Sequence, residues 1–413
     1  MISRPGSNYR AQGLALVDFV GHVRSVPPHP VRSLYVHVPF CGRKCDYCAF
    51  YSEAGSRETM ARYVDALERE MDSISNTATP CLDTLFFGGG TPSLLPIPLW
   101  EKLIDHARNL GLAPGREWTV ECNPATVSWD KARFLRDQGV NRISLGVQAL
   151  DDRILDRLGR IHNRKAVFDS YDLLRRAGFD NINLDLMFGI PGQSLEMWER
   201  TLDDALALQS EHLACYELIY EEDTPLYLEL AAGTVQPDDD LSATMYDMLL
   251  ALTHDHGLIQ YEIANFARHR GHTPTDLPDL ACRHNINYWR GGSFYGLGPS
   301  ASGFVNGIRT RNCASTDIYC ARLENGQLPI ESKDPLSPLA RAGEIAAFGL
   351  RMNCGWQFDE FLATTRFDLR GPWRDDMEDL VQKDLGLLDD EGFRLSHRGL
   401  RFADAAAQSF LRS

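Results

Sequence analysis

The sequence contains no apolar run long enough to span a membrane, and it has a deficit of positive charge. Its 42 Lys and Arg residues stand against 57 Asp and Glu residues, a net charge of −15. Because nucleic-acid phosphates attract basic surfaces, this balance disfavours a nucleic-acid partner. Residues 13–20 are apolar but interrupted by Asp18, and they lack the basic start and long apolar core of a signal peptide. We therefore expect a cytoplasmic protein with no membrane span.

Low-complexity segments are also missing, and no internal repeat is visible beyond an alternation of strand and helix patterns. The 413 residues exceed one ordinary domain, and 44% of them are hydrophobic and 24% charged. These proportions are ordinary for a globular protein and supply enough apolar material for a large core. One large α/β domain with a smaller appendage is the expected organisation.

Cysteine is thinly spread except in one loop, where Cys41, Cys45 and Cys48 lie close together. The other seven cysteines are scattered singly: Cys81, Cys122, Cys215, Cys282, Cys313, Cys320 and Cys354. In a chain without secretory context, scattered cysteines are normally reduced and buried. We expect that state for these seven.

The three clustered cysteines have the spacing C-x3-C-x2-C and directly follow a short apolar strand pattern. Three thiolates on one loop can each bind a different iron of a cubane [4Fe–4S] cluster, which leaves the fourth iron open to a small molecule. A structural zinc site is the alternative, but it requires four ligands, usually as two separated pairs. Disulfide pairing is a second alternative, which the lack of secretory context disfavours. The spacing favours the iron–sulfur cluster.

A regular alternation of strand and helix patterns begins after Val31. Apolar runs that predict buried strands lie at 34–38, 84–87, 119–122, 142–147, 182–187 and 213–219. Helix patterns lie between them, most clearly at 57–73, and also at about 97–110, 129–138, 152–177 and 195–208. Six such units predict an α/β fold with a parallel sheet in a partly closed barrel.

Polar residues stand at the same end of five successive predicted strands. The cysteine loop follows the first, and Gly88-Gly-Gly-Thr-Pro92 follows the second. Glu121, Gln148 and Asp185 lie at or near the ends of the next three. Each of them alone could be a turn residue or a helix cap. Because parallel α/β folds bind ligands at the carboxyl ends of their strands, the five together predict one shared ligand site.

Several motifs resemble those of a known family. The C-x3-C-x2-C spacing is the signature of the radical S-adenosylmethionine (SAM) superfamily. The motifs of its HemN-like branch, the oxygen-independent coproporphyrinogen III oxidase-like proteins, are similar to these stretches: Tyr35-Val-His-Val-Pro-Phe-Cys41, Phe87-Gly-Gly-Gly-Thr-Pro-Ser93, Glu121-Cys-Asn-Pro124, Val140-Asn-Arg-Ile-Ser-Leu-Gly-Val-Gln148, Leu158-Gly-Arg160 and Asn183-Leu-Asp-Leu-Met-Phe-Gly-Ile-Pro-Gly192. Within that branch the chain resembles the HemW-type haem chaperones most closely.

This resemblance implies a partial (β/α)6 radical SAM barrel that holds a [4Fe–4S] cluster and SAM. Cys41, Cys45 and Cys48 would bind the cluster. The residues expected to contact SAM are Tyr35, Tyr47, Gly89, Gly90, Thr91, Glu121, Gln148, Arg160 and Asp185. When both groups are bound, one electron passing through the cluster breaks a sulfur–carbon bond of SAM. The protein supplies orientation and exclusion of water.

One departure from the branch concerns the cluster loop. The coproporphyrinogen dehydrogenases continue the motif with a further cysteine two residues after the third, a position that Phe50 occupies here. The substitution resembles the HemW type and argues against decarboxylation of coproporphyrinogen.

A second motif, His284-Asn-Ile-Asn-Tyr288-Trp289, resembles the H-N-x-x-Y-W stretch linked to haem binding in HemW-type proteins. A histidine can ligate haem iron, and the two aromatic side chains could form a flat apolar wall. Alternatively, His284 is a buried hydrogen-bonding residue that fixes this segment to the barrel. The family often has a histidine in the following turn, where this chain has Ser302.

The expected domain boundaries are an N-terminal extension at 1–32, the radical SAM barrel at 33–270, a connecting segment with the H-N-x-x-Y-W motif at 271–325 and a C-terminal domain of the HemN/HemW type at 326–413. The last of these has a helix pattern at 339–352, then a helix, an Asp-Glu-Gly turn, short strands and a final helix. This order is winged-helix-like. Because the segment is acidic, we expect a lid over the barrel and not a nucleic-acid reader.

The leading hypothesis is a cytoplasmic [4Fe–4S]- and SAM-binding haem chaperone that carries haem as cargo to an acceptor protein. An electron donor such as flavodoxin or ferredoxin would be a further partner. One alternative is a radical SAM methyltransferase or cyclopropanase of the HemN-like class, and the other is an oxygen-independent coproporphyrinogen III dehydrogenase. Only the last is addressed by the sequence, through Phe50.

Overall fold

A computed structural model describes residues 31–75, 81–111, 115–271 and 277–412, together with two short strands, Ala15–Val17 and Val23–Ser25. Apart from these strands and residues 31–32, the predicted N-terminal extension lies outside the described residues. Within the described ranges, none of the helices is both long and apolar enough to cross a membrane.

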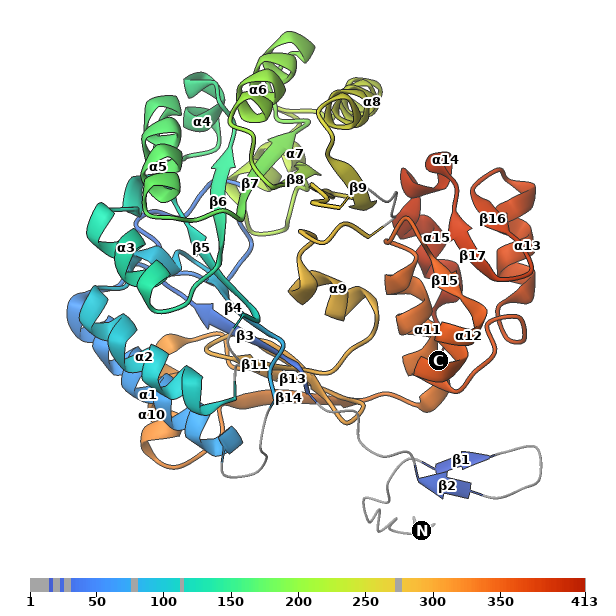
Figure 1. Cartoon of the computed structure of the whole chain (residues 1–413), viewed down its shortest axis with the longest axis horizontal. Coiled ribbons are helices and arrows are strands. Elements are labelled where there is room, and N and C mark those ends of the chain that lie inside the picture. Colours follow the sequence, from blue (N-terminus) through green and yellow to red (C-terminus); the bar gives the residue numbers. More distant parts are fainter. Residues whose placement is uncertain are drawn as a thin grey trace.

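Six parallel strands form the centre of the fold (Figure 1). They are β3 (Ser33–Val38), β4 (Thr84–Gly89), β5 (Glu117–Cys122), β6 (Arg142–Gln148), β7 (Ile182–Phe188) and β8 (His212–Glu217), each paired with the next in chain order. The predicted α/β class and the parallel sheet are confirmed. The last strand ends two residues before the predicted 219, at Glu217.

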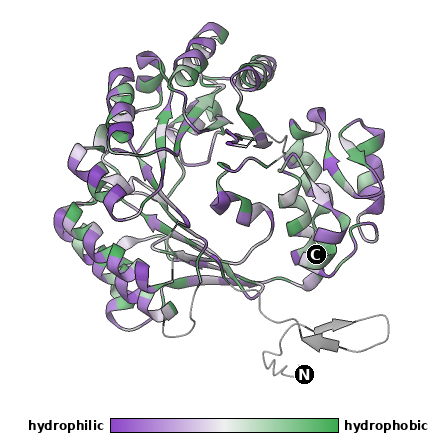
Figure 2. Ribbon diagram, in the orientation of Figure 1, coloured by the Kyte–Doolittle hydropathy of each residue, from purple (hydrophilic) through white to green (hydrophobic). Residues whose placement is uncertain are grey.

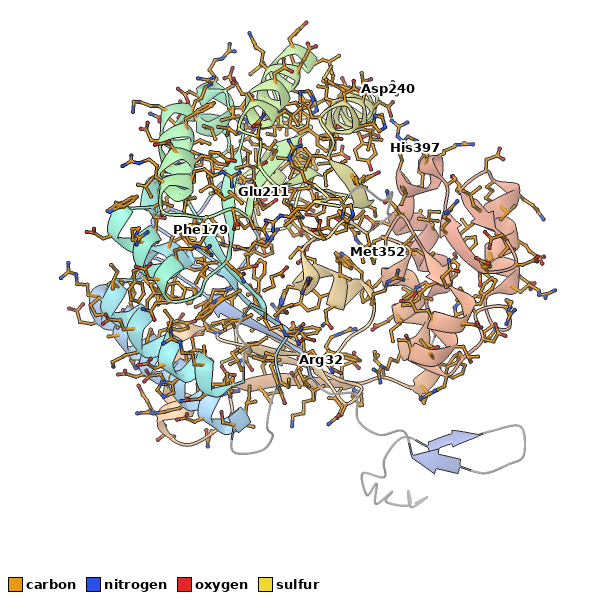
Figure 3. All side chains as sticks on the ribbon, viewed as in Figure 1. Arg32, Phe179, Glu211, Asp240, Met352 and His397 are labelled. Atoms are coloured by element: carbon orange, nitrogen blue, oxygen red, sulfur yellow. The ribbon has the colours of Figure 1, made fainter. Side chains whose placement is uncertain are left out.

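Helices cover the outer side of the curved sheet (Figure 1). The principal ones are α1 (Arg57–Ser75), α2 (Ile97–Asn109), α3 (Trp129–Asp137), α5 (Arg164–Arg176), α6 (Leu195–Ala207) and α8 (Asp239–Asp255). Their hydrophilic residues face away from the strands in Figure 2, and side chains fill the layer between sheet and helices in Figure 3. Helix α1 illustrates the cause, because Tyr63, Val64 and Leu67 recur at helical spacing and are fully buried.

The single helix predicted at 152–177 is wrong, because the structure has two, α4 (Asp152–Arg157) and α5. Gly159 ends the first with φ +69°, a conformation that favours glycine. Asn163 begins the second, since its side chain accepts a hydrogen bond from the Ala166 amide. The break between the helices carries Arg160, and it turns this side chain into the cavity described below.

The sheet continues past the parallel strands on both sides, for twelve strands in all among the described residues. Beside β3 lies β11 (Phe294–Leu297), followed by antiparallel β12 (Ser302–Val305), β13 (Ile308–Asn312) and β14 (Ile330–Pro335). Beside β8 lie β10 (Asn265–Ala267) and β9 (Ile259–Glu262). The predicted connecting segment at 271–325 thus contributes three strands to the main sheet, and the domain boundaries themselves stay predictions.

The C-terminal part has its own apolar core, which includes Trp356, Phe361, Trp373, Phe393 and Phe410. Its helices are α11 (Pro338–Gly349), α12 (Phe358–Thr365), α13 (Arg374–Gln382), α14 (His397–Leu400) and α15 (Ala403–Phe410). Strands β15 (Trp356–Gln357), β17 (Gly392–Leu395) and β16 (Gly386–Leu388) form a small antiparallel sheet in that order. The predicted mixed α+β domain is confirmed.

Four shorter helices connect these elements, and one of them matters for function. They are α4, α7 (Pro225–Ala231), α9 (Arg283–Trp289) and α10 (Thr316–Glu324). Helix α9 carries the H-N-x-x-Y-W motif and lies between the barrel and the C-terminal part (Figure 1).

Glu70 on α1 is a buried carboxyl that ties the helix to the edge strands. It accepts hydrogen bonds from the Gly298 amide (2.9 Å), Asn312 Nδ2 (2.8 Å) and the Tyr319 hydroxyl (2.6 Å). Burial nevertheless raises its pKa from the ordinary 4.5 to about 7.

We expect Glu70 to make stability fall as pH rises. Its pKa is higher in the folded than in the unfolded state, so the folded state holds the proton more tightly between about pH 4.5 and 7. As pH rises through this window, the free energy of unfolding of wild type should fall by up to about 3 kcal/mol relative to that of Glu70→Gln, which cannot ionise. Urea unfolding followed by circular dichroism at several pH values measures the difference. A gap between the two proteins that does not change with pH would contradict the assignment.

Candidate functional site

A cavity of about 620 Å³ opens at the carboxyl ends of the parallel strands. Eleven of the thirteen predicted site residues line it: Cys41, Cys45, Tyr47, Cys48, Gly89, Gly90, Thr91, Glu121, Gln148, Arg160 and Asp185. They come from the cysteine loop, from the ends of β4, β5 and β6, from the middle of β7, where Asp185 lies, and from the break between α4 and α5. The fold therefore gathers polar groups that are far apart in the sequence.

The cysteine loop is held by backbone hydrogen bonds. The Cys41 amide donates to the Glu53 carbonyl (2.9 Å), the Asp46 amide to the Leu158 carbonyl (3.0 Å), and the Cys48 amide to the Cys45 carbonyl (3.2 Å). All three cysteines are free thiols and half-buried. These contacts keep the three sulfur atoms facing one cavity.

The donor set fits a cubane cluster. Arg160 Nη1 donates a hydrogen bond to Cys45 Sγ (3.4 Å), so a cationic side chain lies directly beside the cysteine loop. Among the described residues, no three His, Cys, Asp or Glu side chains converge on a point where a single metal ion could sit. The thiolates that bind a [4Fe–4S] cluster each ligate a different iron. They therefore need to face a common cavity, but they need not converge on a single metal position.

Glycines let the backbone form one wall of the cavity. Gly89 has φ +104°, and a Cβ there would lie 2.5 Å from the His37 ring. A Cβ on Gly90 would lie 2.7 Å from the Phe40 carbonyl oxygen. Neither position has room for a side chain, and so the strand end presents bare peptide groups to a ligand.

Two half-buried carboxyls lie in the cavity lining. Glu121 accepts a hydrogen bond from the Gly89 amide (3.1 Å), and Asp185 accepts one from Asn183 Nδ2 (2.7 Å). Burial, aided by the repulsion from Asp185, raises the pKa of Glu121 to about 8, and burial raises that of Asp185 to about 6. A cationic ligand would stabilise the ionised form of both carboxyls, so the cavity favours a positively charged ligand.

Gln148 stands at an irregular point of the sheet. The pairing of β6 with β7 shifts register between Gly146 and Gln148, and Gln148 has φ +68°, which is uncommon for a residue with a side chain. Its Oε1 accepts a hydrogen bond from the Tyr216 hydroxyl (2.6 Å). This strained position aims the amide into the cavity, as is frequent at binding sites.

The cavity also contains residues that the sequence analysis did not assign to the cluster or SAM site. They include Ser144, Met187, Tyr216, Glu217, Ile219 and Trp289. Tyr216 and Glu217 lie at the carboxyl end of β8, so the strand-end rule could have identified both. Trp289 reaches the cavity from α9, an approach that no local pattern indicates.

Two predicted site residues lie outside this cavity. Tyr35 lines a second cavity, and its hydroxyl is 3.0 Å from His37 Nδ1. His284 is 1% exposed, with Nδ1 2.8 Å from Thr84 Oγ1 and Nε2 2.7 Å from the Tyr288 hydroxyl. Burial and the nearby Arg142 lower its pKa to about 3. In this conformation both ring nitrogens are engaged, as the hydrogen-bonding alternative requires.

A buried chain of hydrogen bonds connects Asp185 with the start of α9. Asn183 bridges Asp185 and His212 Nδ1 (2.6 Å), His212 Nε2 meets the Tyr261 hydroxyl (2.8 Å), and that hydroxyl accepts from the Cys282 amide (3.2 Å). Burial keeps the pKa of His212 well below its usual range, so the ring is neutral. A neutral imidazole with one donor and one acceptor nitrogen satisfies this chain.

Of the seven scattered cysteines, five are buried as expected. Cys81 is exposed and Cys354 is half-buried, so the prediction was wrong for these two. Cys81 precedes β4 at the amino-terminal end of the sheet.

A curved parallel sheet with three free cysteines at its ligand-binding edge defines the class of radical SAM proteins. The sequence profile of the Radical SAM superfamily matches residues 35–205. Such a fold implies a [4Fe–4S] cluster and SAM.

Related proteins narrow the assignment. Heme chaperone HemW of Bacillus subtilis is 34% identical over 386 residues, which cover 92% of this chain and 99% of that protein. Heme chaperone HemW of Escherichia coli is 39% identical over 279 residues, 67% of this chain and 71% of that protein. The chain therefore belongs to the HemW family of the radical SAM superfamily.

A solved structure shows the same fold. Coproporphyrinogen III oxidase (HemN) from Escherichia coli superposes with a TM-score of 0.78, covering 93% of this chain and 91% of that one. The sequence identity is 20%, so this likeness concerns architecture and not activity.

We expect Cys45→Ala to abolish the brown absorbance and the bound iron of anaerobically reconstituted protein. The cysteines lie on a half-exposed loop outside the apolar core, so the far-ultraviolet circular dichroism should not change. Cys81→Ala, an exposed cysteine away from the cavity, is the matched control and should keep its iron. Equal iron content in both variants would contradict the cluster assignment.

We expect SAM to bind more tightly as pH rises from 6 to 8. Glu121 attracts a cation only when its carboxyl is ionised. Because its pKa is about 8, this carboxyl is mostly protonated at pH 6. The gain should be about tenfold or more, and Glu121→Gln should remove most of it. Isothermal titration of the reconstituted protein at both pH values tests this. A wild-type affinity that does not change with pH would show that Glu121 does not meet the ligand's charge.

Proposed function

We propose that this protein is a cytoplasmic haem chaperone that holds haem as cargo and passes it to an acceptor protein. Cys41, Cys45 and Cys48 would bind a [4Fe–4S] cluster, and the other residues of the 620 Å³ cavity would hold SAM. A flavodoxin or ferredoxin would supply electrons to the cluster. The names of the HemW relatives, which cover nearly the whole chain, support the cargo.

The observation that carries this proposal is the place of Trp289. The last residue of the H-N-x-x-Y-W motif lines both the cysteine cavity and the second cavity beside it. Cargo held against this motif would share a wall with the SAM site. Chaperoning that depends on the cluster and on SAM requires such contact between the two sites.

Phe50 bears on the alternative of a coproporphyrinogen dehydrogenase. It lines the cysteine cavity with 68% of its surface exposed, at the position where those enzymes have a further cysteine. A phenylalanine can neither ligate metal nor transfer a proton. Phe50 does not distinguish a haem chaperone from a methyltransferase or a cyclopropanase.

Haem titration of the reconstituted protein is the direct test. We expect a saturable Soret band at about one haem per chain, and no decarboxylation of coproporphyrinogen III when SAM and a reductant are supplied. Decarboxylation with turnover would overturn the chaperone assignment in favour of the enzyme.

His284 can be tested through its hydrogen-bond partner. Nε2 is held by the Tyr288 hydroxyl, so Tyr288→Phe would free this nitrogen while keeping the ring. If His284 ligates haem iron, we expect Tyr288→Phe to tighten haem binding and shift the Soret maximum, and His284→Ala to abolish the shift. If His284 only anchors α9, His284→Ala should lower the midpoint of thermal unfolding and leave the Soret position unchanged.

A further inference from the structure

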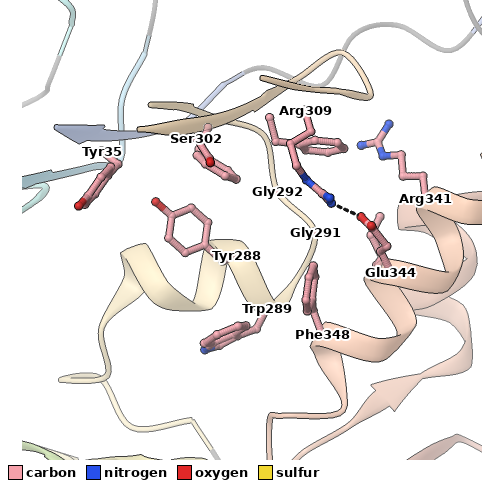
Figure 4. A pocket seen from close by; sticks show the side chains of 13 residues that line it. Tyr35, Tyr288, Trp289, Gly291, Gly292, Ser302, Arg309, Arg341, Glu344 and Phe348 are labelled. Carbon is pink, nitrogen blue, oxygen red and sulfur yellow. Dashed lines mark hydrogen bonds and ion pairs between the residues drawn. The ribbon is translucent and has the colours of Figure 1, made fainter. Parts of the chain in front are cut away.

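A second cavity, of about 410 Å³, lies on the other side of Trp289. Figure 4 shows it between α9, the edge strands of the main sheet and α11 of the C-terminal part. Its volume is within the range of small-molecule sites in proteins. Of the twelve residues predicted for the cluster and SAM, only Tyr35 lines this space, and the other eleven line the cavity that contains the cysteines.

Six of the thirteen residues that line it are aromatic: Tyr35, Tyr288, Trp289, Phe294, Phe304 and Phe348. Tyr288 and Phe294 pack edge to face with their centroids 4.4 Å apart, which fixes one wall. Phe348 on α11 is 44% exposed, although large apolar side chains are usually buried. Walls of this kind suit a flat, apolar ring system.

Three charged side chains line the cavity, and only one of them lacks an ionic partner. Arg309 pairs with Glu344, as the dashed line in Figure 4 shows, so these two charges offset each other. Arg341 forms no ion pair among the described residues, and its Nε is buried without a hydrogen-bond partner. Its guanidinium lies 5.0 Å from the centroid of the Phe304 ring.

An unpaired, partly buried guanidinium is costly for the ligand-free protein. Burial lowers the pKa of Arg341, which shows that its surroundings disfavour the charge. A carboxylate offsets this cost best, because the planar fork of arginine matches its two oxygens. The cavity therefore combines aromatic walls with one site for an anion.

We propose that this cavity binds a planar aromatic carboxylate, with the ring system against the aromatic walls and a carboxylate on Arg341. We infer that this ligand is haem, bound through a propionate; the identity of the ligand rests on the proposed function. Trp289 then separates the cargo from the SAM cavity, so occupancy of either cavity acts on the same side chain.

The test compares porphyrins with free and esterified carboxylates on the reconstituted full chain. Ferric haem, metal-free protoporphyrin IX and the dimethyl esters of both are titrated into wild type, Arg341→Gln and Arg341→Lys. Arg370→Gln is the control, because Arg370 also lies over a phenylalanine (Phe358, 4.9 Å) but outside the cavity. The thermal midpoint of each variant is measured; Arg341→Gln should equal or exceed wild type, since it removes an unpaired charge.

We expect wild type and Arg370→Gln to bind both free acids about tenfold or more tighter than the esters. Arg341→Gln should weaken both acids by about the same factor and abolish the preference, and Arg341→Lys should restore part of it. Equal binding of acids and esters by wild type, or an unchanged preference in Arg341→Gln, would overturn the proposal.

Failure of the chaperone function would look different. If protoporphyrin IX binds with dependence on Arg341 but haem does not, the cavity assignment stands and haem is not the cargo. If neither free acid binds to wild type, both proposals are overturned.

Discussion

Parallel pairing of six consecutive strands is the constraint on which the site depends. In such a sheet neighbouring strands end at the same edge, so the residues after them meet whatever their separation in sequence. The register makes this concrete: Val38 pairs with Gly89, Glu121 with Ser144, and Gly146 with Asp185. In each pair, a residue that lines the cavity lies next to a neighbouring strand, and that strand leads into or carries a further part of the cavity wall. The cysteine loop, the glycines and the carboxyls thus reach one volume although they lie far apart in the sequence.

Helix α9 is attached to this sheet by polar groups and not by a large apolar face. Glu117 on β5 accepts the amides of Arg283 (2.9 Å) and His284 (3.0 Å), and Thr84 on β4 bonds the His284 ring. These bonds lie in a buried region, where an unpaired polar group is expensive. They hold Trp289 between two cavities, one lined by cysteines and carboxyls and the other by aromatic rings. One short helix therefore sets the geometry that a coupled chaperone needs.

Much of the barrel and of its site could be predicted from the sequence, because local patterns determine both. Apolar runs predicted all six parallel strands, and the strand-end rule predicted the side chains that follow them. Helical periodicity, by contrast, did not reveal the break inside the predicted helix at 152–177. Gly159 and Asn163 divide this segment into two helices, although either residue alone is tolerated within a helix. The edge strands β11 to β14 were also missed. Strands β11 and β12 have only four residues each, and β11 joins the sheet by pairing with β3, which lies far from it in the sequence.

The sequence by itself determined the superfamily, the cluster loop and the order of the parallel strands. The reason is that thiolate spacing and hydrophobic periodicity are properties of adjacent residues. Tertiary structure alone decided the surroundings of His284, whose ring nitrogens are taken by Thr84 and Tyr288, and the place of Trp289 between two cavities. It also decided that Arg309 pairs with Glu344 while Arg341 forms no ion pair with any residue that the structure describes. Burial and partnership depend on which segments pack together, and these can lie far apart in the sequence, as Thr84 and His284 do.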